Sequence, residues 1–344
     1  MKMDRVIGQE GIKSHLIEAI KNGRIAHAQL FTGKKGSGGL PLALAYAQLI
    51  VANFSTGDWT EKPDESALIK SQKIVHPDIH FVFPVNKTDT IKPKDPVSDD
   101  FIHLFRKVII KNPYQSLNDW YNFIGIGNSQ GKIGVPEIVI LLKKLSLKPF
   151  ESKFKVIIIW MPELMNDQAA NKILKILEEP PKNTLFLLVS EDTDQLLPTI
   201  ISRTQIVKLA PLTDQEVANG LMSQFKIPTN QASGIAHLAS GSYQRAIKLT
   251  KENKIGEFNR NEFVSWMRLC FTKDVNSLMK WSANMAKQKR ENLKLFFEYA
   301  LHMFRESLIL NYSDPGLLRL EGSEKEFAIK FAPFINQANC IRMV

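Results

Sequence analysis

AQLFTGKKGSGGLP, residues 28–41, is the stretch that decides the fold. Its first four residues are typical of a short buried strand, and a glycine-rich loop follows them. Leu40 to Asn53 is predicted to be a helix, with Pro41 in its first turn, where proline is tolerated. A strand, a glycine loop and a helix in this order are the context that a phosphate-binding loop requires.

The loop departs from the phosphate-loop pattern G-x-x-x-x-G-K-[ST] at its last two positions. Glycines occupy the expected places, but Gly39 replaces the lysine and Leu40 replaces the hydroxyl residue. A lysine neutralises the nucleotide phosphates and a Ser or Thr hydroxyl holds Mg²⁺, so only the backbone amides of the loop could still bind phosphate. The loop is predicted to be a relic, and its glycines are Gly33, Gly36, Gly38 and Gly39.

A second strand has lost its chemistry in the same way. The run Val-Ile-Ile-Ile at 156–159 is typical of a buried strand, and in P-loop ATPases such a strand ends in an acidic residue that positions Mg²⁺ and water. Here Trp160 and Met161 follow the run, and the first carboxylate is Glu163. Two losses in matched order favour a relic ATPase over a chance turn. The sequence predicts no ATP hydrolysis by this chain and no bound cofactor.

The rest of the chain divides by its hydrophobic patterns. Strand and helix signals alternate up to about residue 207, with fully apolar strands, which predicts a parallel sheet covered by helices on both faces. Beyond residue 213 only helical patterns remain. We expect an α/β P-loop domain at 1–207, a small helical domain at 208–254 and an all-α domain at 255–344, truncated at NCIRMV. Within the first domain, 54–75 is expected to be irregular, 79–85 a strand and 100–125 short helices.

Composition sets outer limits on function. The chain has 344 residues, a net charge of +10 and a pI of about 9.4, which fits a nucleic-acid or acidic protein partner as well as an ordinary solvated basic surface. No basic stripe with interleaved aromatic residues is present. Two cysteines, Cys270 and Cys340, suit a reducing compartment, and no apolar stretch reaches the ~20 residues of a membrane helix. We expect a cytoplasmic protein.

Three polar motifs remain. Arg203, flanked by Ser202 and Thr204, could pair with a carboxylate of its own domain or project onto a neighbour as an arginine finger. Arg245 stands near a helix start, where a cation is disfavoured, which hints at a role. His76-Pro77-Asp78 is better explained as a turn with a capping aspartate than as a metal ligand, because no cysteine precedes residue 270. No metal site is predicted.

Several of these segments together resemble one family. They are IGQE (7–10), RIAHAQLF (24–31), the altered glycine loop, HPD (76–78), the long block NDQAANKILKILEEPPKNTLFLLVSEDTDQLLPTIISRTQ (166–205) and GSYQRAI (241–247). In this order they resemble the delta-prime subunits of bacterial DNA polymerase III clamp loaders, within the AAA+ family. The resemblance spans roughly residues 1–250, and the block 166–205 is its most specific part.

The resemblance implies a non-hydrolysing subunit with an ATPase-like domain, a helical lid and a collar. It implies a hetero-pentamer with gamma/tau motor subunits and a delta subunit, which loads a sliding clamp onto primer-template DNA. The arginine of the family's S-R-C motif, which reaches a neighbour's ATP site, corresponds to Arg203, and the sensor-2 arginine corresponds to Arg245. Thr204 replaces the cysteine of that motif. Many members also carry four zinc-binding cysteines ahead of H-P-D, and this chain has none.

Two other functions stay open at this point. The chain could be an unconventional ATPase that uses Lys34 or Lys35, which predicts Mg-ATP binding with turnover. It could also be a stand-alone DNA-binding protein, which predicts tight and steeply salt-dependent DNA binding by the isolated chain.

Overall fold

The computed structural model describes residues 2–55, 60, 62–91, 93–126, 129–251, 253–288, 290–312, 320 and 322–336. The chain divides into two compact units, of which one comprises residues 1–224 and 240–245 and the other residues 225–239 and 246–344. Each unit is described by itself. The three predicted domains, with boundaries after residues 207 and 254, stay a prediction.

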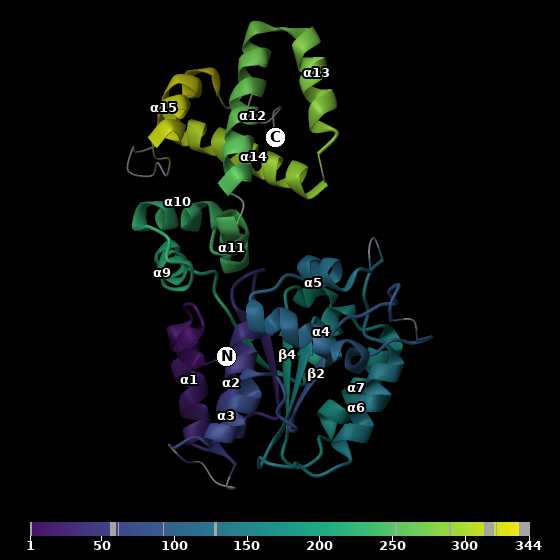
Figure 1. The fold of residues 1–344 in the computed structure, drawn as a ribbon. Coiled ribbons are helices and arrows are strands. Elements are labelled where there is room, and N and C mark those ends of the chain that lie inside the picture. The colour runs from purple at the N-terminus through teal and green to yellow at the C-terminus, as the bar shows by residue number, and fades with distance from the viewer. Residues whose placement is uncertain are drawn as a thin grey trace. The chain divides into compact units, whose positions relative to one another are not determined.

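The first unit is built on a five-stranded parallel sheet in the order β2-β3-β4-β1-β5 (Figure 1). The strands are β1 (Ala28–Thr32), β2 (Ile79–Val82), β3 (Lys155–Trp160), β4 (Thr184–Ser190) and β5 (Gln205–Lys208). β3 and β4 are buried along their whole length, as their continuous apolar sequences predict. The predicted parallel α/β fold is confirmed.

Helices cover both faces of this sheet (Figure 1). Those of the first unit are α1 (Glu10–Lys21), α2 (Gly39–Asn53), α3 (Glu65–Gln72), α4 (Ser98–Lys111), α5 (Leu117–Ile124), α6 (Val135–Leu145), α7 (Asp167–Glu178), α8 (Pro198–Ile201) and α9 (Asp214–Phe225). Successive strand residues point to opposite faces. Ile158 therefore packs in the core beneath α2 and α4, while Ile157 and Ile159 pack in the core beneath α6 and α7.

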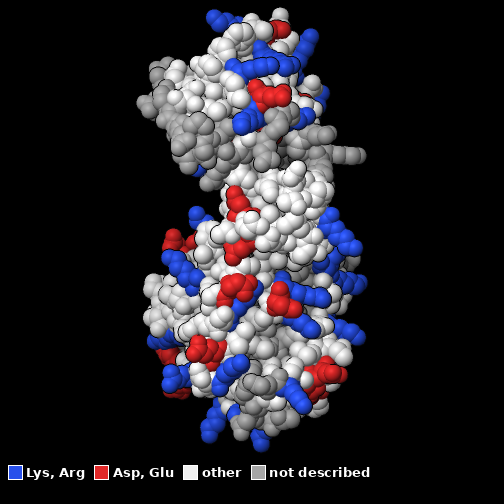
Figure 2. All heavy atoms as spheres, turned by 90° about the vertical axis from the view of Figure 1, so that its left-hand side faces the viewer, with Lys and Arg blue, Asp and Glu red and all other residues white. Residues whose placement is uncertain are grey.

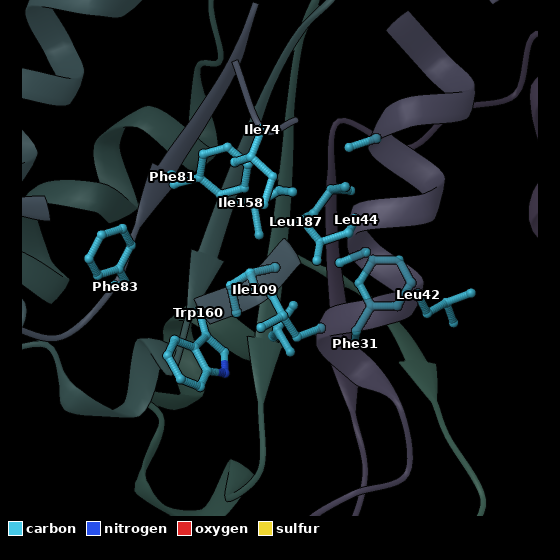
Figure 3. Packing of buried hydrophobic residues seen from close by; sticks show 14 of the residues in the cluster. Phe31, Leu42, Leu44, Ile74, Phe81, Phe83, Ile109, Ile158, Trp160 and Leu187 are labelled. Carbon is cyan, nitrogen blue, oxygen red and sulfur yellow. The ribbon is translucent and has the colours of Figure 1, made fainter. Parts of the chain in front are cut away.

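The core beneath α2 carries most of the large side chains. Phe31 of β1, Leu42 of α2 and Leu187 of β4 belong to it, and Figure 3 shows these side chains gathered between helix and sheet. Trp160 closes the same core at the end of β3, only 2% exposed, and its ring lies 6.0 Å from that of Phe105. Buried aromatic residues of this size contribute strongly to stability.

Local structure differs from expectation in three segments of the first unit. The segment 54–75 was predicted to be irregular, which is wrong where the structure describes it, because it contains α3. The side chain of Asp64 caps this helix by accepting from the N–H groups of Ser66 and Ala67. The predicted strand 79–85 ends at Val82, since Pro84 has no N–H for the ladder. The region 100–125 holds one 14-residue helix, α4, and one short helix, α5.

The second unit is helical throughout its described residues, as predicted. Its helices are α10 (Thr229–Ala239), most of α11 (Tyr243–Lys251), α12 (Asn253–Thr272), α13 (Val275–Met285), α14 (Arg290–Tyr312) and α15 (Gly322–Phe331). Phe263 of α12 is fully buried and makes edge contacts with rings of α14 and α15. The end NCIRMV, with the predicted truncation and Cys340, lies outside the described residues.

The surface carries charges of both signs. On the face drawn in Figure 2, Lys and Arg side chains alternate with Asp and Glu side chains over the described residues. No helix in the described part of the chain is long and apolar enough to cross a membrane.

Candidate functional site

The glycine loop forms the tight turn between β1 and α2. Gly36 and Gly38 have φ angles of 84° and 98°, in the left-handed region that favours glycine, and Gly38 is the N-cap of α2. A Cβ on Gly36 would lie 2.1 Å from Ser242 Oγ. The backbone conformation and the close packing therefore both require glycine at position 36, whether or not a nucleotide binds.

Side chains fill the space in front of this loop. The remaining cavity is about 30 Å³ and is lined by the loop together with Tyr114, Trp160, Glu191 and Gln244. Ligand pockets usually measure ~300 to 1,000 Å³, so the cavity holds little more than a water molecule. The glycine loop keeps the shape of a phosphate cradle, and little free volume lies in front of it in this conformation.

Tyr114 lines the cavity and lies against the glycine loop. Its ring lies 3.5 Å from the position of a Cβ on Gly38, and its hydroxyl accepts a 2.7 Å hydrogen bond from the N–H of Ile7. The ring also meets Tyr243 edge to face at 4.7 Å, and the N–H of Tyr243 donates to the carbonyl of Gly36 at 3.1 Å. These contacts connect Tyr114 to the first residue of α11 and to the N-terminal segment.

The carboxylates near the end of β3 serve the fold. Glu163 Oε1 accepts from the N–H of Glu191 at 3.0 Å, and burial raises the pKa of Glu163. Burial raises the pKa of Glu191 to about 7, with Lys35 opposing that shift and Glu163 adding to it. Trp160 stands where an acidic residue of a working site would end the strand. The loss of a metal-binding position at the end of β3 stays a prediction.

Arg203 lies in the turn between α8 and β5. It forms an ion pair with Glu178 at the end of α7, and its Nη1 donates to the carbonyl of Thr199 at 3.0 Å. The Arg203 side chain is 35% exposed and that of Glu178 is 47% exposed. Ser202 and Thr204 donate their hydroxyls to the carbonyls of Thr199 and Ile201, which closes the turn on either side of Arg203. Of the two readings of Arg203, the pair within its own domain is the one present in the isolated chain.

Arg203 and the glycine loop stand at opposite ends of their strands. β5 runs parallel to β1, with Gln205 beside Gln29 and Lys208 beside Thr32. Arg203 therefore precedes the amino end of β5, whereas the glycine loop follows the carboxyl end of β1. The four residues of β5 alone separate the two by roughly 13 Å, at about 3.3 Å per residue. Arg203 is not placed to act on a ligand in its own chain's glycine loop.

Arg245 lies in the first turn of α11, beside the closed cavity. Its N–H donates to Ser242 Oγ at 3.3 Å, and its neighbour Gln244 is the side chain that lines the cavity. The structure thus brings Arg245 near the glycine loop, while Arg203 lies elsewhere, and the sensor-2 role of Arg245 stays a prediction.

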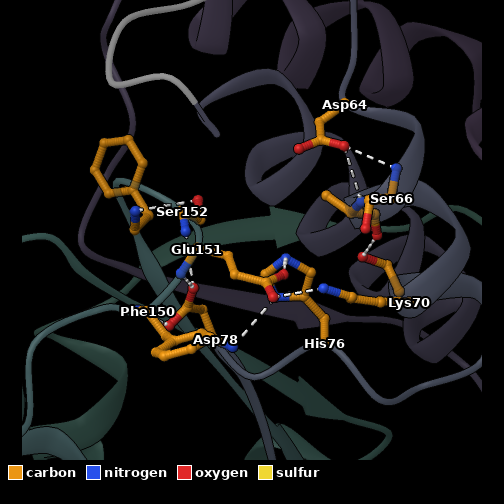
Figure 4. Close-up of polar contacts among 11 residues, drawn as sticks. Asp64, Ser66, Lys70, His76, Asp78, Phe150, Glu151 and Ser152 are labelled. Carbon is orange, nitrogen blue, oxygen red and sulfur yellow. Dashed lines mark hydrogen bonds and ion pairs between the residues drawn. The ribbon is translucent and has the colours of Figure 1, made fainter.

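His76-Pro77-Asp78 is a structural motif. The Asp78 carboxylate accepts hydrogen bonds of 2.6, 2.7 and 2.8 Å from the N–H groups of Phe150, Glu151 and Ser152 (Figure 4). Glu151 in turn pairs with Lys70 of α3. Burial, the largest influence, lowers the pKa of His76. The prediction of a capping aspartate agrees with these bonds, although Asp78 caps a distant loop and not its own turn.

Sequence reasoning missed Tyr114, Gln244 and Glu178. Glu178 could have been found, because it lies in the specific block 166–205, two residues before Pro180 and Pro181. Tyr114 carried no signal, since its role depends on contacts that the fold alone brings together.

The strand order, with a glycine loop after β1 and helices on both faces, defines a P-loop α/β protein of the AAA+ type, whose loop has Gly39 and Leu40 at the lysine and hydroxyl positions. Residues 8–213 match the family model described as DNA polymerase III, delta subunit, which is more than half of the chain. The chain belongs to this family.

Curated relatives agree. The chain is 28% identical over 249 residues to the DNA polymerase III subunit delta' of Bacillus subtilis, covering 72% of this chain and 61% of the relative. It is 31% identical over 117 residues to subunit delta' of Escherichia coli, covering 34% and 35%. Subunit tau of B. subtilis is 24% identical over 253 residues, covering 72% and 37%. The chain thus spans less than two thirds of these relatives' length. The resemblance to delta-prime subunits is confirmed.

Solved structures give weaker likenesses. A DNA polymerase III gamma subunit-related protein from Thermotoga maritima has a TM-score of 0.36 at 17% identity, covering 93% of this chain and 90% of that chain. The RuvB protein of the same organism has a TM-score of 0.44 at 16% identity, covering 100% and 87%. The fold class rests on the strand order and the family match.

Proposed function

We propose that this chain is a non-hydrolysing clamp-loader subunit of DNA polymerase III. In this proposal it scaffolds a hetero-pentamer with gamma/tau motor subunits and a delta subunit, and it takes part in loading a sliding clamp onto primer-template DNA. The observation that carries the proposal is the closed glycine loop, which lacks both gripping side chains and keeps a cavity of about 30 Å³.

In the same proposal, Arg203 acts as an arginine finger at the ATP site of a neighbouring subunit. Three observations support it: the side chain is partly exposed, it lies at the sheet end away from this chain's own glycine loop, and its ion pair with Glu178 is also partly exposed. An exposed ion pair is worth only ~0.2 to 1 kcal/mol, so a neighbouring nucleotide could draw the guanidinium away at little cost. Arginine is the residue best suited to bind phosphate oxygens in pairs.

Reconstitution tests the role of Arg203. The full chain, its motor and delta subunits and the clamp are assembled, and DNA-stimulated ATPase is compared for wild type and Arg203→Ala. An arginine finger is worth ~10³-fold or more at the site it serves, and the total loss is diluted by ATP sites that other subunits serve. We expect a clear loss of stimulated ATPase with the assembly intact by gel filtration.

Lys182→Ala is the matched control, because Lys182 is an exposed cation in the loop that leads into β4. It should leave the stimulated ATPase unchanged. If Arg203→Ala leaves the stimulated ATPase unchanged, as Lys182→Ala does, Arg203 does not act at a neighbour's ATP site and serves only in its ion pair with Glu178. If the wild-type chain does not assemble with these partners, the proposed function itself fails.

Mg-ATP titration of the isolated chain tests the alternative of an unconventional ATPase. Lys34 and Lys35 are exposed, and the cavity that Lys34 lines has a volume of only about 30 Å³. We expect no micromolar binding and no turnover. Binding with turnover would overturn the non-hydrolysing role while leaving the family unchanged.

A further inference from the structure

Two histidines and a glutamate meet in the second unit. His237 lies on α10, and His302 and Glu306 lie on α14. One ligand atom from each side chain can be chosen so that all three lie within 4.8 Å of one another. The two imidazole rings have centroids 5.6 Å apart with their planes at 53°. All three residues belong to the same compact unit.

The spacing of the two α14 residues suits a chelate. Residues four apart on a helix lie on the same face, one turn above the other, so His302 and Glu306 present their side chains side by side. His237 then supplies a third group from a second helix. Two imidazoles and a carboxylate are a ligand set that zinc uses in proteins, with water in the fourth position.

The candidate site is enclosed on one side. Glu306 is only 1% exposed, so an ion bound to its carboxylate would be held inside the unit. His237 and His302 are partly exposed, which leaves an ion a route from solvent.

We propose that His237, His302 and Glu306 bind one divalent transition-metal ion of the zinc type. Zinc–nitrogen distances of about 2.0 Å place tetrahedral ligands about 3.3 Å apart, so the ligand atoms, which lie within 4.8 Å of one another, must close by at most about 1.5 Å on binding. Rotation about side-chain bonds supplies this movement. The ion ties α10 to α14 within the second unit. The site differs from the sequence-based prediction of no metal, and it does not depend on the proposed function.

Metal titration of the full-length, untagged chain tests the site. The chain is stripped with a chelator and titrated with Zn²⁺, and separately with Co²⁺, whose visible spectrum reports tetrahedral coordination. We expect one equivalent of Zn²⁺ to bind, to raise the melting temperature and to displace Co²⁺. Glu306→Gln and His237→Gln should each weaken binding by more than about 100-fold, because even indirect partners of a metal site are worth 10- to 100-fold.

His103→Ala is the matched control, since His103 is an exposed histidine on α4 of the first unit. It should keep the full zinc affinity and the full rise in melting temperature. The far-UV circular dichroism of each stripped variant must match that of wild type, and His302→Asn is used if Glu306→Gln does not fold. Equal zinc binding by wild type, Glu306→Gln and His237→Gln would overturn the proposal, as would the absence of binding to the wild type.

Discussion

Asp78 organises its surroundings through a single buried carboxylate. Its side chain accepts three backbone N–H groups from residues 150–152, and the residue is 2% exposed. These bonds fix the segment that leads into β3, and the Asp78 carbonyl accepts from Val156 of that strand at 2.8 Å. The motif therefore stabilises the sheet next to β2.

Replacing Asp78 should be strongly destabilising. Asp78→Ala leaves three N–H groups without their acceptor, and each hydrogen bond to a charged group is worth about 1.5 to 3 kcal/mol. We expect the free energy of unfolding of the first unit to fall by at least about 3 kcal/mol in urea titrations. Asp64→Ala, which removes an exposed helix cap of α3, should lower it by only about 1 kcal/mol. Equal losses for the two variants would contradict this role.

Glu191 is expected to make the folded chain less stable as the pH rises, because its pKa is raised. Its pKa in the folded chain is about 7, above the ordinary value of 4.5, because the half-buried carboxyl is desolvated and, to a smaller extent, because Glu163 lies near it. The folded state therefore binds the proton more tightly than the unfolded state does. The contribution of Glu191 to stability is greatest below about pH 4.5, falls as the pH rises to about 7 and stays low above that.

Glu191→Gln should remove this dependence. We expect the variant to melt at the same temperature as wild type near pH 5 and several degrees higher near pH 8, since one pKa unit corresponds to about 1.4 kcal/mol. Melting curves at the two pH values measure the difference. Glu18→Gln, at an exposed position of α1, should show no such divergence. A Glu191→Gln variant that is less stable than wild type at pH 8 would show that the charged form is favoured.

Among the elements, the turn from β1 into α2 has the strictest sequence requirement. Gly36 combines a φ of 84° with a near contact to Ser242 Oγ, so a methyl group there meets both backbone strain and a clash. Gly11 of α1 has open space around its Cα and an ordinary helical backbone. The two glycines make a matched pair.

Alanine at the two positions should have opposite effects. Gly36→Ala should lower the free energy of unfolding by about 1 to 3 kcal/mol, whereas Gly11→Ala should raise it by about 0.5 to 1 kcal/mol, because alanine favours the helix. Urea titration followed by circular dichroism measures both. If Gly36→Ala leaves the free energy of unfolding unchanged, the fold does not require glycine at position 36.

Elements with a strong local pattern could be predicted from the sequence. The apolar runs of β3 and β4 and the amphipathic α7, capped by Asn166, lie where their patterns place them. The helix α3 was missed because it is only eight residues long and shows little amphipathic pattern, although Lys70 on it pairs with Glu151, 81 residues further on. The place of Tyr114 beside the glycine loop depends on tertiary contacts, so no local pattern reports it.

At the scale of the whole molecule, two cores of different character are held by one chain. The first unit buries its sheet between two helical layers, while the second relies on aromatic residues around Phe263. The family match covers residues 8–213, which lie in the first unit. The second unit lies outside this match. The proposed metal site lies in that second unit.

The net charge of +10 leads to the last prediction, which concerns DNA. A stand-alone DNA-binding protein concentrates Lys and Arg on one surface, so that phosphate contacts add up. In Figure 2, charges of both signs share the face shown, so this face is not a purely basic surface. We expect an apparent Kd no tighter than ~10⁻⁶ M for primer-template DNA at physiological salt, typical of non-specific contact.

Fluorescence anisotropy across a salt series measures this affinity for the isolated chain and for the reconstituted complex. The complex should bind far more tightly than the chain, because the DNA contacts are then shared among subunits. Each phosphate contact adds about 0.9 to the slope of log K against log salt. A nanomolar affinity of the isolated chain, with a slope as steep as that of the complex, would make it a DNA-binding module in its own right. A shallow slope with micromolar affinity would mean that the net charge of +10 belongs to an ordinary solvated surface. Tight DNA binding would then require the assembled complex.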